Sequence, residues 1–88
     1  MKDIADWRNC IDDIDSQLLR LLNERARCAC EIGCIKEKNG MTVYNPDRER
    51  AILSKLGDKN KGPLADSAIQ KIFETIIEQC RSLEKEKK

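Results

Sequence analysis

One helical pattern in this chain is too long for the domain that contains it. Apolar residues recur at spacings of three and four at Ile4, Trp7, Ile11, Ile14, Leu18, Leu21, Leu22, Ala29, Ile32 and Ile35. This spacing predicts an amphipathic helix over about residues 4–38, which only Gly33 interrupts. A helix of about 35 residues is about 52 Å long, at 1.5 Å per residue.

The length of the chain limits what this helix can pack against. The chain has 88 residues, and a compact domain of that size has a radius of gyration of about 12 Å. The helix therefore extends past any core that one copy can build, and a second copy would cover the excess apolar surface. We expect an intertwined homodimer. The alternative is a helix that breaks at Gly33 and folds back into a four-helix monomer.

Two further helices are expected after a stop at Asn39-Gly40. Asn45 is a good helix cap and Pro46 a good first helical residue, so a short helix is predicted at about residues 46–57. The segment GDKNKGPL is expected to be a loop. A third helix, at about residues 64–85, carries its apolar positions at Ala68, Ile69, Ile72, Phe73, Ile76, Ile77, Cys80 and Leu83.

These patterns predict a single all-α domain over residues 1–88. Its helices are long, short and long, and two chains would form a six-helix bundle. The 17 basic and 16 acidic residues give a net charge of +1, which argues against a nucleic-acid or membrane-binding surface. No apolar run approaches the roughly 20 residues of a membrane span, and no signal peptide opens the sequence, so we expect a cytoplasmic protein.

The cysteines do not form a recognisable metal or disulfide pattern. Their number is odd, none are spaced as C-x-x-C, and the sequence has no histidine. We interpret all five as reduced, buried small side chains in a reducing compartment: Cys10, Cys28, Cys30, Cys34 and Cys80. The missing histidine also excludes catalysis by a Ser-His or Cys-His pair.

Two cations of the first helix lie among small and apolar residues. Arg25 and Lys36 are eleven residues apart, which places them within about 20° of each other on one helix face. Gly33 lies between them, and a glycine inside a helix implies either close helix contact or room for a ligand. Arg8 is about 100° away from Arg25 around the helix, so it would reach the same pocket only across a two-fold axis.

The other helices add further polar groups. Arg48 and Glu49 lie in the first turn of the second helix, and Cys80 and Glu84 are spaced i, i+4 on the third. Singly, such residues are typical of a solvated surface. Together they indicate a cationic, partly buried pocket with two carboxyl groups, which suits a small dianion.

Four segments occur in a characteristic order between Ile4 and about Glu84: WRNCIDDIDSQLLRLLNERA, EIGCIK, NPDRERAIL and GPLADSAIQKIFETIIEQCR. With these segments the sequence resembles the all-helical chorismate mutase family. The resemblance implies a domain-swapped dimer with two active sites that convert chorismate to prephenate in phenylalanine and tyrosine biosynthesis. That reaction is an intramolecular rearrangement, so no cofactor, metal or nucleophile is expected, and catalysis rests on conformational restraint and stabilisation of negative charge.

The resemblance also implies roles for individual residues. Arg8 would enter the site from the partner protomer, and Arg25 would bind a substrate carboxylate. Lys36 would donate to the ether oxygen and a carboxylate. Arg48 would support the pocket, and Glu49 would accept the ring hydroxyl of the substrate.

The remaining positions of the site differ from some members of the family. Asn45 stands where members often have aspartate, and Cys80 where some have serine, a better hydrogen-bond donor. Glu84 would lie opposite Lys36 on the ether oxygen, where only a protonated carboxyl donates, and some members have glutamine there. Lys36, Glu84 and Arg25 are thus the expected catalytic residues, and Gly33 is expected to keep the pocket wall open.

Other interpretations remain open at this point. Isochorismate-pyruvate lyase resembles the family in fold and pocket, although the NPDRE segment and Glu49 favour the mutase. A non-catalytic helical dimer module would make Arg25, Lys36 and Glu84 dispensable. Whether the domain acts alone or within a larger two-function enzyme is not readable from the sequence.

Overall fold

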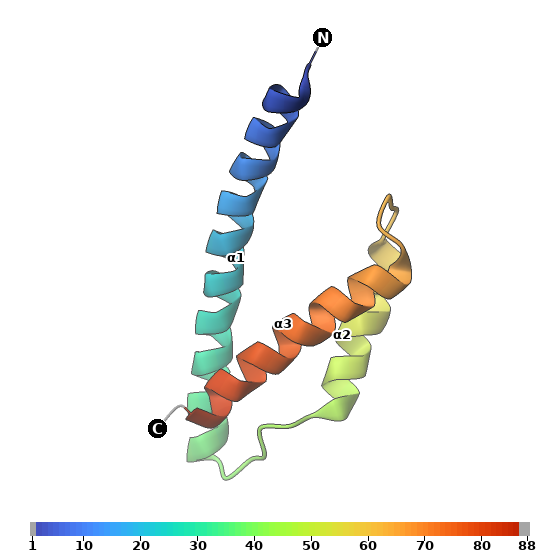
Figure 1. Cartoon of the computed structure of the whole chain (residues 1–88). Coiled ribbons are helices and arrows are strands. Elements are labelled where there is room, and N and C mark those ends of the chain that lie inside the picture. The colour runs from blue at the N-terminus through green and yellow to red at the C-terminus, as the bar shows by residue number, and fades with distance from the viewer. Residues whose placement is uncertain (1, 87–88) are drawn as a thin grey trace.

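Three helices make up the chain in a computed structural model, which describes residues 2–86. They are α1 (Ile4–Lys38), α2 (Pro46–Lys59) and α3 (Asp66–Glu86). In Figure 1, α1 is one long rod, α3 crosses it near its C-terminal end, and α2 lies beside α3. The predicted all-α fold with long, short and long helices is confirmed.

The first helix is continuous and capped at both ends. Asp3 accepts a hydrogen bond from the backbone N–H of Asp6 at 3.0 Å, and the Asp6 side chain accepts one from the N–H of Asp3 at 3.2 Å. At the other end, Gly40 adopts φ 66° and the N–H of Met41 donates to the carbonyl of Lys36 at 2.8 Å. This Schellman-type ending confirms the stop expected at Asn39-Gly40. The four-helix alternative is wrong, because the helix passes through Gly33 without a break.

The second helix begins as expected, with the Asn45 side chain accepting from the N–H of Arg48 at 3.1 Å. It ends at Lys59, so residues 57–59 of the expected loop are helical, which corrects the prediction. Gly57 lies within the helix and does not end it, because its backbone does not adopt the left-handed conformation typical of a helix end. The cap is instead supplied by Asn60, whose N–H donates to the carbonyls of Leu56 and Gly57.

The third helix begins at Asp66, two residues later than predicted. The side chain of Asn60 donates to the Leu64 carbonyl at 2.9 Å and to the Asp66 carboxylate at 2.6 Å. These bonds hold Leu64 outside the helix. The first helical carbonyl is therefore that of Ala65, which accepts from the N–H groups of Ala68 and Ile69.

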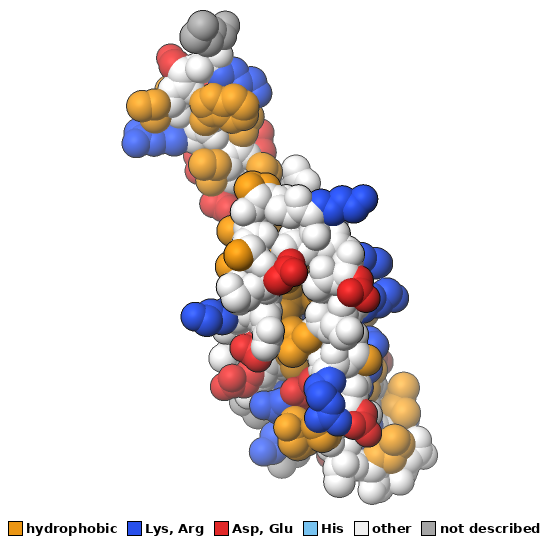
Figure 2. Space-filling view, turned by 90° about the vertical axis from the view of Figure 1, so that its right-hand side faces the viewer, with side chains coloured by type: hydrophobic (Ala, Val, Ile, Leu, Met, Phe, Trp, Pro, Cys, Tyr) orange, Lys and Arg blue, Asp and Glu red, His pale blue; other side chains and the backbone are white. Residues whose placement is uncertain are grey.

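Only α3 packs against both other helices within residues 2–86. The N-terminal half of α1 has no neighbour there, and its apolar side chains are about half exposed or more: Ile4, Trp7, Ile11, Ile14 and Leu18. Figure 2 shows hydrophobic (orange) side chains gathered at the upper end of the molecule. The described chain measures 57 × 25 × 15 Å with a radius of gyration of 16.2 Å, against about 12 Å for a compact domain. One copy therefore leaves much of its long helix without a core.

Among the helices of residues 2–86, none combines the length and the apolar character needed to cross a membrane.

At Gly33 the backbones of α1 and α3 come close together. A Cβ atom added to Gly33 would lie 3.0 Å from the Cα of Glu84 and 3.2 Å from its Cβ and its carbonyl oxygen. Such distances are below ordinary van der Waals contact, so a side chain here would force the helices apart. Gly33 serves close helix contact, and the expectation that it keeps a pocket wall open is wrong.

The close contact at Gly33 predicts opposite effects of one substitution at two sites. Gly33→Ala should lower the free energy of unfolding by up to about 2 kcal/mol, because overpacking costs about 1–3 kcal/mol and alanine's helix propensity returns only about 1 kcal/mol. Gly57→Ala, with open space around its new Cβ, should raise it by up to about 1 kcal/mol. Urea unfolding at a fixed protein concentration measures both. Stabilisation by both substitutions would contradict the tight contact.

Candidate active site

A cavity of about 330 Å³ lies between the C-terminal half of α1, the linker 39–45, the start of α2 and the end of α3. Its apolar wall includes Ala29, Ile32, Ile52 and Ile77. Seven of the eight expected site residues line it: Arg25, Lys36, Asn45, Arg48, Glu49, Cys80 and Glu84. Three helices that are separate in sequence thus bring these residues to one place.

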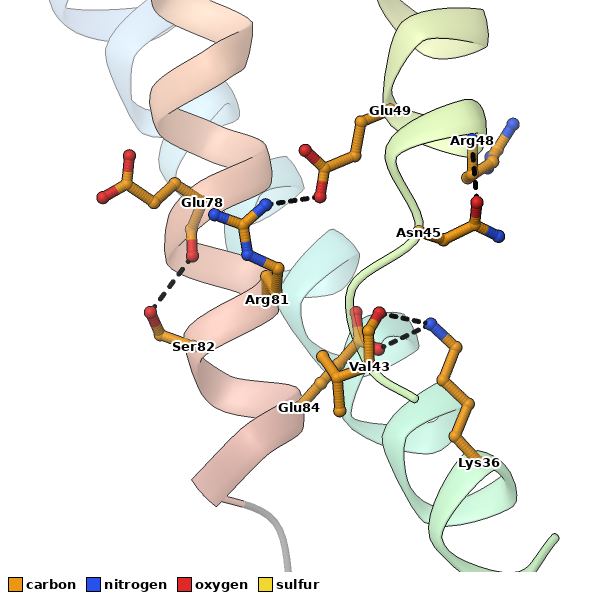
Figure 3. A network of polar contacts seen from close by, with 9 residues as sticks. All are labelled: Lys36, Val43, Asn45, Arg48, Glu49, Glu78, Arg81, Ser82 and Glu84. Carbon is orange, nitrogen blue, oxygen red and sulfur yellow. Dashed lines mark hydrogen bonds and ion pairs between the residues drawn. The ribbon is translucent and has the colours of Figure 1, made fainter. Parts of the chain in front are cut away.

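Lys36 and Glu84 form the most enclosed ion pair of residues 2–86. Lys36 Nζ lies 3.3 Å from Glu84 Oε1, and the two side chains are 15% and 13% exposed. The same ammonium donates to the carbonyl of Val43 at 2.8 Å, as Figure 3 shows. The contact of Gly33 with Glu84 brings the carboxylate to this place, since Lys36 is three residues after Gly33 on the same helix.

The start of α2 supplies a second group of polar side chains. Asn45 uses its side-chain oxygen as the helix cap, so its amide NH2 group is left for other partners. The N-terminal end of a helix carries partial positive charge, which favours a bound anion. Within residues 2–86 neither Arg48 nor Arg25 has an ion-pair partner, and both line the cavity. Two guanidinium groups are therefore available to an anionic ligand.

Arg81 lines the same cavity and was missed by the sequence reasoning. Its Nη1 donates to Glu49 Oε2 at 2.5 Å, and its guanidinium lies 4.8 Å from the ring centroid of Tyr44. The hydrogen bond to the Glu49 carboxylate raises the pKa of Arg81 above its ordinary value. Helical spacing could have indicated that Arg81 faces the cavity, because it follows Ile77 by four residues and precedes Glu84 by three.

The cysteines differ in burial. Cys80 is buried and lines the cavity, whereas Cys28 lines it but is exposed, and Cys10, Cys30 and Cys34 are half-buried. All five are free. The prediction that every cysteine is buried is therefore wrong for a single copy of the chain, because much of α1 has no helix packed against it. No group of three or more acidic or cysteine side chains in residues 2–86 is arranged to hold a metal.

Arg8 is the one expected residue that does not line the cavity. It is exposed on the N-terminal half of α1. Its Cα is seventeen residues before Arg25, about 25 Å along the helix at 1.5 Å per residue. Arg8 therefore cannot enter the cavity of its own chain.

The cavity carries an excess of positive charge. Its lining includes four cationic side chains, Arg25, Lys36, Arg48 and Arg81, and two carboxylates, Glu49 and Glu84, a net charge of +2. Because the pocket is partly enclosed by apolar walls, this charge is screened less than charge on an open surface. The arrangement is complementary to a small dianion.

Comparisons with known proteins agree with this geometry. The family described as chorismate mutase type II matches residues 7–85. The chorismate mutase of Methanocaldococcus jannaschii is 33% identical over 84 residues, which cover 94% of this chain and 85% of that protein. The form II structure of the chorismate mutase of Thermus thermophilus superposes with a TM-score of 0.93 at 36% identity and covers 96% of each chain.

Other relatives are much longer than this chain. The bifunctional chorismate mutase/prephenate dehydratase of Neisseria gonorrhoeae is 45% identical over 78 residues, which cover 89% of this chain and 21% of that protein. The protein of the same name from Aquifex aeolicus is 43% identical, over 97% of this chain and 25% of its own length. The chain thus spans about a fifth to a quarter of these relatives.

Proposed function

Because the chain belongs to the chorismate mutase type II family, we propose that it is an isomerase that converts chorismate to prephenate, in the biosynthesis of phenylalanine and tyrosine. The observation that carries the proposal is the convergence of Lys36 and Glu84 in a cavity of net charge +2. Chorismate is a dianion, so its charge matches that of the cavity. The family match and the related structure from Thermus thermophilus support the same reaction.

The proposed chemistry is an intramolecular rearrangement in which the ether C–O bond breaks as a new C–C bond forms. No group is transferred to the protein, so no nucleophile or cofactor is needed. The cavity holds the enolpyruvyl arm over the ring, which replaces an entropically costly alignment in solution. Negative charge that develops on the ether oxygen in the transition state is stabilised by donors already in position.

Lys36 and Glu84 are the proposed donors to that oxygen. The Lys36 ammonium has three protons, and its bond to the Val43 carbonyl orients it while leaving protons for the substrate. Glu84 donates only when it is protonated. In the unliganded chain the two groups pair with each other, so substrate entry exchanges this pair for contacts with the ether oxygen.

The other residues are proposed to hold the substrate. Arg25 binds one carboxylate, with the planar geometry that suits two parallel hydrogen bonds, and Arg48 supports the pocket with its charge. Glu49 accepts the ring hydroxyl. Contacts from the Asn45 amide and the Cys80 thiol complete the set, the thiol being the weaker donor.

We further propose that two chains form an intertwined dimer with two such sites. The exposed apolar residues on the N-terminal half of α1 supply the reason, since a second copy would remove them from water. In this dimer Arg8 enters the partner's cavity. The cytoplasm is the proposed location, because five thiols suit a reducing compartment.

The first prediction concerns turnover. Purified protein mixed with chorismate should consume it, followed by ultraviolet absorbance, and form prephenate as the identified product. Lys36→Ala should lower kcat by about a hundredfold or more, because one preorganised donor is worth about that factor. Lys38→Ala, an exposed lysine of the same helical turn, should have little effect. Turnover of isochorismate with release of pyruvate would favour the lyase, and inactivity on both substrates would contradict the proposal.

The second prediction concerns which chain of the dimer supplies Arg8 to each site. Light scattering should give about twice the 10.1 kDa of one chain. Arg8→Ala and Lys36→Ala proteins, each nearly inactive, should regain about a quarter of normal activity when unfolded together and refolded, because half the dimers are mixed and each has one intact site. A mixture of Arg25→Ala and Lys36→Ala should stay inactive, since both residues serve the same site. Equal behaviour of the two mixtures would show that Arg8 does not cross between chains.

The third prediction concerns pH. An ionised Glu84 has no proton to donate and would repel the developing charge, so the proposed role needs the protonated carboxyl, and kcat should be lower at high pH than at low pH. Glu84→Gln should keep its activity at high pH, because an amide donates at any pH. Glu74→Gln, an exposed position of the same helix, should keep the original profile. An unchanged profile in Glu84→Gln would exclude this role.

A further inference from the structure

We infer that Arg81 is a positioning residue that holds the Glu49 carboxylate at the wall of the cavity and keeps it away from the cations that bind the substrate. The inference rests on the proposed function, since it deepens the account of the same site. Arg81 is not among the residues to which the family resemblance assigned a role. Its role follows from its contacts with two other segments of the chain, the first turn of α2 and the linker 39–45.

The contacts of Arg81 join α3 to both segments that close the cavity. Its Nη1 donates to Glu49 in the first turn of α2, and its guanidinium stacks on Tyr44 in the linker 39–45. Figure 3 shows the side chain reaching from α3 towards Glu49. A planar guanidinium makes both contacts at once, whereas an ammonium has no flat face to stack.

This ion pair differs from the surface pairs of the chain. Arg81 and Glu49 are 28% and 24% exposed and are 32 residues apart in the sequence. The pairs Arg20–Glu24 and Arg50–Asp47 each lie within one helix, and their side chains are between 47% and 88% exposed. Exposed pairs of that kind contribute little. The Arg81–Glu49 pair instead links two helices beside the cavity and is better shielded from water.

The charges of the cavity give this pair its function. Glu49 lines the same cavity as Arg25 and Arg48, which have no ion-pair partner within residues 2–86. A free carboxylate there would compete with the substrate for those guanidinium groups and repel a dianion. Arg81 neutralises Glu49 and takes one oxygen, Oε2. The other oxygen, Oε1, is left to accept a hydroxyl group, which is the role proposed for Glu49.

The test is a double-mutant cycle on chorismate turnover with Arg81→Ala, Glu49→Gln and the double variant. Arg81→Ala should raise KM by about tenfold and change kcat less, since it weakens ground-state binding more than the chemistry. In the Glu49→Gln background the same substitution should have little further effect, because a neutral amide needs no counter-ion. Arg81→Lys should restore part of the affinity, since it keeps the charge without the stacking plane.

Two controls separate positioning from folding. Arg50→Ala removes an exposed arginine of α2 and should leave KM unchanged. Circular dichroism and light scattering should show that each variant keeps its helices and its dimer. If Arg81→Ala does not fold, Arg81→Met serves instead, because its unbranched stem keeps packing without charge.

Three results would overturn the inference. The first is an equal effect of Arg81→Ala on KM in the unsubstituted chain and in the Glu49→Gln variant. This would mean that Arg81 acts on the substrate directly or only through the fold. A fall in kcat with KM unchanged would mean the same. Failure of the unsubstituted chain to turn over chorismate would overturn the proposed function and this inference with it, whereas turnover with additive effects overturns the inference alone.

Discussion

The contact between Gly33 of α1 and Glu84 of α3 is the constraint on which the site depends. The two backbones approach so closely that a single Cβ atom at Gly33 would lie 3.0 Å from the Cα of Glu84. This approach fixes α3 at the point where its carboxylate meets Lys36, one helical turn further along α1. Ala29 and Cys80, which lie one turn earlier on each helix, are both buried. The same packing that stabilises the pair of helices therefore sets the distance between two proposed catalytic groups.

Much of this architecture follows from the sequence because it is local. Helical spacing and caps, such as Asp3, Asn45 and Asn39-Gly40, act within a few residues and need no tertiary context. The end of α2 was misplaced because Gly57 resembled a stop, and only the contacts of Asn60 show where the cap lies. Local signals of this kind locate an element well, and its last turn less well.

The interactions between helices were harder to predict. The sequence allowed two explanations for Gly33, close helix contact or room for a ligand. Spacing on one helix does not say which surface another helix presents to it. Arg81 resembled one more charged residue on an amphipathic helix, since its partners are 32 residues away in Glu49 and in a linker without periodicity. The residues taken from the family resemblance did converge on one cavity, with Arg8 as the exception. Their arrangement therefore depended on knowledge of a fold, and spacing alone would not have supplied it.

Arg8 and Arg81 have different places relative to the cavity: Arg81 lines it, and Arg8 does not. The N-terminal half of α1 extends beyond the contact with α3 and carries exposed apolar side chains, so burial of this half and the role proposed for Arg8 would both need a surface from outside the chain. Arg81 acts within the chain, where it ties α2 and the linker to α3. Without Arg81 and Lys36, the carboxylates of Glu49 and Glu84 would be free to pair with Arg25 and Arg48, which line the same cavity. Glu49 is instead paired with Arg81, and Glu84 with Lys36. The guanidinium groups of Arg25 and Arg48 therefore stay available, and their two positive charges account for the net charge of +2 that the cavity offers to a ligand.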